Sequence, residues 1–130
     1  QSSANTKILA ITQLTSTSEE MLHQEQLVKA SMEQSVENYA KLAAQAGLDG
    51  VVCSAFEARK IKEVTGQDFL AVTPGIRLES DAHDDQKRVV SPGQAAQYGA
   101  SMIVVGRSIT QAKDPYQTYR DIKKSWKEGI

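Results

Sequence analysis

The chain has 130 residues, of which 40% are hydrophobic and 24% charged, an ordinary composition for one folded domain. Its formal net charge of -1 lacks the basic excess of a general nucleic-acid binder. No apolar run approaches the roughly 20 residues of a membrane-spanning helix, and the polar start has no apolar region like that of a signal peptide. We therefore expect neither a nucleic-acid nor a membrane partner. The single cysteine, Cys53, allows no internal disulfide and fits a cytoplasmic protein.

The first part of the chain predicts a strand followed by a helix. Residues 7–14 form an apolar run typical of a strand, and residues 18–30 follow as an amphipathic or frayed stretch. A helix is predicted over residues 31–48, with Gly47 as its stop. Apolar residues recur there at spacings of three and four, which places them on one face: Val36, Tyr39, Ala40, Leu42, Ala43 and Ala46.

A second unit follows directly. The apolar run at residues 50–54 predicts a strand, in which Cys53 is a small buried thiol. Ser54 and Glu57 have the spacing of a capping box, so a helix is predicted from there to about Val64.

The third unit has a strand at residues 69–73 and a helix at residues 91–99. Ser91 is the expected N-cap of that helix, Pro92 its first residue and Gln94 the second member of a capping box.

The fourth unit has a strand at residues 102–105 and a closing helix at residues 114–126. Asp114 is the expected N-cap of this helix, and Pro115 its first residue.

All four predicted strands are continuous apolar runs, which is typical of parallel strands covered on both faces. Each is followed by a helix, so we predict an α/β fold with a parallel sheet, in one domain over residues 1–130. Four parallel strands would leave two apolar edges bare, which natural proteins avoid. Either another chain covers these edges or the chain is part of a larger unit.

The segment between the third strand and its helix, residues 74–90, is long. Roughly 17 residues stand where about two to six are typical. Long loops in compact domains are commonly binding loops, and this one carries Arg77 and Gln86; a solvated insertion is the alternative. His83 and the scattered aspartates around it have no recognised ligand spacing, so we expect no metal site.

The fourth strand ends at Gly106 and Arg107. A glycine lets the backbone come close to a ligand, and a guanidinium binds a phosphate with two parallel hydrogen bonds. A short helix from Ser108 onward would add an N-terminus that favours an anion. Barrel enzymes frequently hold phosphate on the loops after their last two strands. We therefore predict a phosphate site here, and the alternative is a turn with a surface arginine.

Five segments, LAITQLTSTS, GLDGVVCS, VTPGIR, DQKRVVSP and IVVGRSIT, together closely resemble the bacterial orotidine 5'-phosphate decarboxylases. The likeness runs from about Ile8 to Trp126 and covers the C-terminal half of that family. Because the family fold is a (β/α)8 TIM barrel, the resemblance implies the C-terminal half of such a barrel, strands five to eight. The bare edges would then meet the missing half.

The resemblance also implies a reaction and its contacts. The family removes CO₂ from orotidine monophosphate to give uridine monophosphate, without metal or organic cofactor. The loop after residue 74 resembles the family's mobile phosphate loop. The implied substrate-binding residues are Arg77, Gln86, Gly106 and Arg107 at the 5'-phosphate, Thr15 at the pyrimidine and Pro74 beside the base pocket.

The family's catalytic charge network is absent from this sequence. That network is an Asp-x-Lys-x-x-Asp motif with a further lysine, on the first half of the barrel. Asp121 and Lys123 begin such a motif, but no aspartate stands three residues after the lysine. We expect them on a solvated helix face, so this chain carries no catalytic residue.

Two other functions stay open. One is a non-catalytic nucleotide-binding half-barrel whose edges pair with a second copy. The other is a different phosphate-binding barrel, such as a sugar-phosphate lyase or isomerase, which the combination of TPGIR and DQ disfavours. The expected partners are a nucleotide and either an N-terminal half-barrel or a second copy of the chain; the resemblance also implies a homodimer.

Overall fold

A computed structural model describes residues 5–78 and 90–130 of the chain. None of the helices in this part is long and apolar enough to cross a membrane. The described elements, in chain order, are β1 (Leu9–Ile11), α1 (Glu19–Gln24), α2 (Met32–Gln45), β2 (Gly50–Val52), α3 (Ala55–Thr65), β3 (Leu70–Thr73), α4 (Pro92–Gln97), β4 (Met102–Ile103), α5 (Arg107–Thr110) and α6 (Pro115–Glu128).

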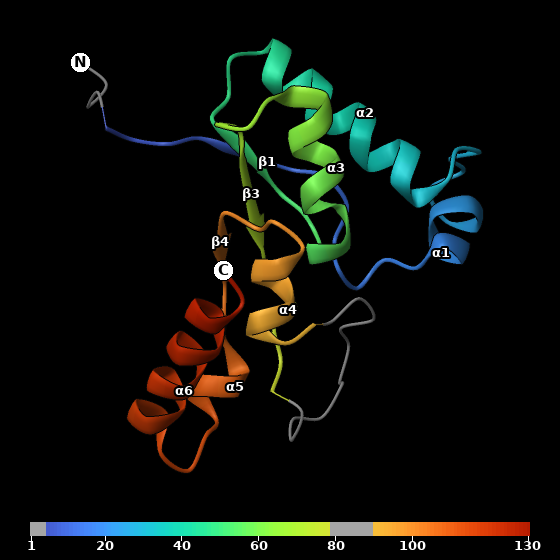
Figure 1. The fold of residues 1–130 in the computed structure, drawn as a ribbon. Coiled ribbons are helices and arrows are strands. Elements are labelled where there is room, and N and C mark those ends of the chain that lie inside the picture. Colours follow the sequence, from blue (N-terminus) through green and yellow to red (C-terminus); the bar gives the residue numbers. More distant parts are fainter. Residues whose placement is uncertain (1–4, 79–89) are drawn as a thin grey trace.

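The four strands form one parallel sheet in the order β1-β2-β3-β4 (Figure 1). Helix α2 packs against α3, and α4 packs against α6, so the helices form two neighbouring pairs. The predicted α/β class with parallel strands is confirmed. The strands are shorter than predicted, because apolar residues continue past the paired part: residues 7–14 were expected in the first strand, but Leu9–Ile11 form it.

Local sequence signals determine where the helices begin. The boxes predicted at Ser54 and Ser91 are present, and Asp114 caps α6 by accepting a hydrogen bond from the N–H of Gln117 at 3.0 Å. The stretch predicted as amphipathic or frayed contains a regular helix instead, α1. Its N-cap is Ser18, whose hydroxyl accepts from the N–H of Met21.

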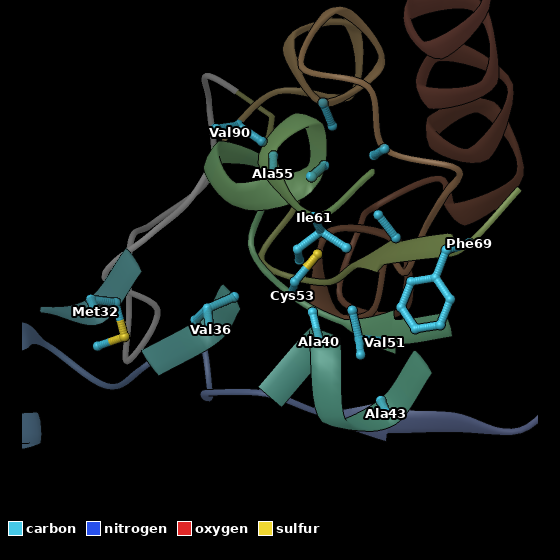
Figure 2. Close-up of a cluster of buried hydrophobic side chains, with 14 of the residues drawn as sticks. Met32, Val36, Ala40, Ala43, Val51, Cys53, Ala55, Ile61, Phe69 and Val90 are labelled. Atoms are coloured by element: carbon cyan, nitrogen blue, oxygen red, sulfur yellow. The ribbon is translucent and has the colours of Figure 1, made fainter. Parts of the chain in front are cut away.

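The hydrophobic core lies between the sheet and the helices α2 and α3. Figure 2 shows Ala40 of α2, Val51 of β2 and Ile61 of α3 in this cluster, and all three are fully buried. Cys53 belongs to the same cluster, as predicted. The sheet therefore has one well-covered face, the one that these helices pack against.

The opposite face of the sheet is not covered along its outer strands. Side chains alternate between the two faces of a strand, and those that alternate with the core residues are exposed: Ile11 by 57%, and Met102 and Val104 by 53% each. Within the described residues, one face of β1 and β4 is therefore left uncovered. Their composition suits two covered faces, but the helices described here cover one.

Candidate functional site

The carboxyl ends of β3 and β4 bring two arginines to one edge of the sheet. Thr73 is in register with Ile103, and the N–H of Val104 donates to the carbonyl of Thr73 at 2.9 Å. Arg77 and Arg107 each stand four residues beyond this registered pair. The neighbouring parallel strands therefore place both arginines at the same, carboxyl-terminal end of the sheet.

Hydrogen bonds to Val90 fix the backbone around Arg77. Ile76 and Val90 form a parallel bridge, in which the N–H of Arg77 donates to the carbonyl of Val90 at 3.1 Å. Gly75 has a φ of 75°, a conformation that glycine adopts without steric cost. Arg77 is 8% exposed, and its Nη1 donates to the carbonyl of Ile76 at 2.9 Å. The arginine that follows β3 therefore has a fixed backbone and a largely buried side chain.

The turn after β4 leaves room at its glycine. A Cβ added to Gly106 would meet no described atom within 4 Å, and the φ of this residue is -106°, outside the left-handed region. Packing between the described residues therefore does not require a glycine here. The short helix α5 begins at Arg107, one residue earlier than predicted, and Arg107 is half-buried.

The other predicted contacts lie elsewhere or outside the described part. Pro74 is half-buried directly after β3, next to the arginine pair in sequence. Thr15 is 5% exposed in the loop after β1, at the same carboxyl end of the sheet as the arginines but beside the outer strand farthest from β4. Gln86 lies outside the described residues, as does His83.

Residues 1–122 match the model of the orotidine 5'-phosphate decarboxylase / HUMPS family. The chain belongs to this family. It is similar to the orotidine 5'-phosphate decarboxylase of Listeria monocytogenes serotype 4b, with 61% identity over 92% of this chain and 52% of the relative. The enzyme of the same name from Enterococcus faecalis is 57% identical over 94% of this chain and 52% of its own length.

Solved structures agree with the family. The crystal structure of orotidine 5'-phosphate decarboxylase from Lactobacillus acidophilus matches 92% of this chain and 49% of its own, with a TM-score of 0.75 at 44% identity. An uncharacterized conserved protein from Geobacillus kaustophilus matches with a TM-score of 0.73 at 43% identity. The chain thus spans about half the length of the relatives it matches.

The sequence did not single out two buried polar residues near the strand ends, although both lie in segments that resemble the family. Thr73 is fully buried, and its Oγ1 has no hydrogen-bond partner among the residues that the structure describes. Gln13 is 7% exposed and forms side-chain hydrogen bonds to two other segments. A polar residue at the end of an apolar run was the available signal, but it does not distinguish a buried side chain from a solvated one.

No cluster of metal-ligating side chains is present in the described part. No group of three or more His, Cys, Asp and Glu residues could hold a metal ion in residues 5–78 and 90–130. Asp121 and Lys123 are exposed on α6, and Asp121 accepts a hydrogen bond from Nε2 of Gln117 at 2.8 Å. The prediction that they lie on a solvated helix face is confirmed.

Proposed function

We propose that this chain is the phosphate-binding half of an orotidine 5'-phosphate decarboxylase, which converts orotidine monophosphate into uridine monophosphate and CO₂ without a cofactor. The observation that carries the proposal is the arginine pair. Arg77 and Arg107 stand four residues beyond one registered strand pair, in a chain 61% identical to a relative of that name. Two arginines at one sheet edge suit a dianionic phosphate, because each can donate two parallel hydrogen bonds.

The nucleotide would extend across the strand ends. Its 5'-phosphate contacts Arg77, Gln86, Arg107 and the amide of Gly106, and the open space at Gly106 gives it access to the backbone. The pyrimidine lies toward Thr15, with Pro74 beside the base pocket. This direction agrees with the strand order, because Thr15 follows β1 and the arginines follow β3 and β4.

The phosphate contacts act on the reaction from a distance. Binding energy from a remote group can lower the barrier at the reacting carbon when it is realised in the transition state. Because this chain lacks the Asp-x-Lys-x-x-Asp motif, the groups that expel CO₂ and protonate the product carbon belong to the other half of the barrel. The enzyme would act in the cytoplasm as a homodimer.

The other half of the barrel would cover the bare surfaces of this one. Two strand edges are unpaired in the described sheet, and the exposed residues of β1 and β4 would line the barrel interior. A second surface is a mostly apolar groove of about 320 Å³ between β4 and α6, lined by Ile103, Val105, Ile109, Tyr119, Ile122, Lys123 and Trp126.

The charge at this groove indicates what packs into it. Arg120, Lys123 and Lys127 are exposed along the neighbouring face of α6. A helix from the other half with an apolar face and an acidic flank would fit, because opposite charges at a rim favour the correct pairing. A separately expressed N-terminal half of the relative should bind this chain, and binding should weaken with salt. Two halves that stay apart in size-exclusion chromatography would contradict this arrangement.

The decisive experiment is Arg107→Ala in the full-length protein. Loss of a charge-assisted phosphate contact should lower kcat/KM for orotidine monophosphate by about 3 kcal/mol, on the order of 100-fold. Lys60→Ala is the control, because it removes an exposed cation from the middle of α3 and should leave turnover unchanged. A loss below about threefold for Arg107→Ala would remove this arginine from the site.

A further inference from the structure

A pair of side-chain amides, buried Gln13 and exposed Gln26, joins the end of β1 to the chain that follows α1. Nε2 of Gln13 donates to Oε1 of Gln26 at 3.2 Å, and Nε2 of Gln26 donates back to Oε1 of Gln13 at 3.2 Å. Nε2 of Gln13 also donates to Oγ of Ser35, on the first turn of α2, at 3.2 Å. Gln13 therefore satisfies its own buried polar atoms by linking three segments, and a buried amide without partners would be costly.

The backbone next to Gln26 is in a conformation that needs support. Leu27 has a φ of 56°, the one positive φ of a non-glycine residue among the described residues, and its side chain is 79% exposed. A residue with a side chain is strained in the left-handed region. Such conformations persist where the surrounding structure fixes them. The amide pair supplies one such constraint, since it holds the residue preceding Leu27 against the end of β1.

The loop between these anchors carries Thr15. Gln13 fixes its beginning, and Ser18 fixes its end by capping α1. Inside the loop, the N–H of Thr17 donates to the carbonyl of Leu14 at 2.9 Å. Thr15 lies two residues after Gln13, so a shift of the Gln13 side chain would move the loop at its base.

We propose that Gln13 is a positioning residue, which holds Thr15 in place for its contact with the pyrimidine of the nucleotide. This inference rests on the proposed function, and it gives a role to Gln13, which lies in the segment LAITQLTSTS but was assigned no contact there. Gln13 acts through the loop and touches no ligand itself. Because a displacement of about 1 Å at a positioning group can cost two orders of magnitude in rate, the amide pair should affect how the base is held.

The test compares a ligand that has a base with one that lacks it. In the full-length protein, Gln13→Ala should weaken uridine monophosphate binding by about tenfold, the loss of roughly one buried hydrogen-bond network. Binding of ribose 5-phosphate should change by less than about twofold, because the arginines that hold the phosphate lie on other strands. Both affinities are measured by isothermal titration calorimetry.

Two further variants separate positioning from general damage. Gln13→Glu keeps the shape of the side chain but cannot donate to Gln26 when ionised, so it should reproduce the selective loss even if Gln13→Ala folds poorly. Ser101→Ala removes a comparable hydrogen bond, from the N–H of Ala71 at 3.1 Å, at the opposite end of the sheet. It should leave both affinities unchanged.

Each outcome decides between the two proposals. An equal loss for both ligands, or no loss for either, would overturn the role of Gln13 while leaving the phosphate site intact. A wild-type protein that binds neither ligand would overturn the proposed function, and the role of Gln13 with it.

Discussion

The inner and outer strands of the sheet differ in what this chain provides for them. Ile11, Val52, Val72 and Met102 form one registered row across the four strands. Val72 of β3 is 6% exposed and Val52 of β2 is half-buried, whereas Ile11 of β1 and Met102 of β4 expose more than half of their surface, 57% and 53%. All four residues are apolar, so composition does not explain the difference. The inner strands complete their packing within the described chain, and the outer strands carry apolar surface that this chain leaves uncovered.

The largest expected effect comes from opening the inner core. Ile61 is fully buried between α3 and the sheet, and Ile61→Ala should lower the free energy of unfolding by about 4 kcal/mol, from lost transfer energy and the cavity left behind. Met102→Ala removes a half-exposed side chain and should cost less than about 0.5 kcal/mol in this chain alone. Urea unfolding measures both.

The same two variants test, in the full-length protein, whether the outer strands stay exposed. If the other half covers β4, Met102→Ala should cost about 1–3 kcal/mol in the full-length protein, because the side chain is then buried. An unchanged small cost there would show that the exposed face of β4 stays solvated.

A smaller effect is expected from crowding β2 against β3. A Cβ added at Gly50 would collide with the carbonyl and the Cβ of Leu70, so Gly50→Ala should cost about 3 kcal/mol by forcing the two strands apart. Gly47→Ala is the matched control, because a Cβ there would meet nothing within 4 Å and only its φ of 80° is unfavourable. Its cost should be about 1 kcal/mol in the same urea experiment. Equal costs would argue against tight contact between the inner strands.

The smallest effect is expected at Asp49, which links the segments that precede β1 and β2. Its carboxylate accepts from the N–H of Ile8 at 2.8 Å and from Nζ of Lys7 at 3.0 Å, and these bonds hold the pKa of Asp49 below its ordinary value of 3.8. A carboxyl with a lowered pKa contributes stability above its unfolded pKa and loses it as the pH falls through the folded one. Asp49→Asn should therefore slightly lower the Tm near neutral pH, and the gap should close in acid. A gap that widens in acid would contradict this.

Local signals in the sequence predicted much of the fold. The boxes at Ser54 and Ser91 and the cap at Asp114 were predicted because each depends on residues a turn apart. The lengths of the strands were not, because pairing depends on register with distant segments. The exposure of Met102 was missed for the same reason, since an apolar side chain does not reveal which surface covers it.

The candidate site, too, was predicted from the sequence only in part. Arg77 and Arg107 follow strands that the sequence predicted as neighbours in chain order, and the sheet brings them to one edge. Gln13 was missed, because its partners, Gln26 and Ser35, are 13 and 22 residues away and no spacing rule connects them. A hydrogen bond between loop side chains is visible only once the chain has folded.

Thr73 and Ile103 are in register, and Arg77 and Arg107 each follow one of them by four residues. One extra residue after either strand would carry its arginine about 3 Å beyond the other, with no change in composition or charge. The two arginines are therefore level along the sheet because each follows its registered residue by the same number of positions. Insertions in residues 74–76 or 104–106 should be rarer among relatives than substitutions there, because a substitution leaves both intervals intact.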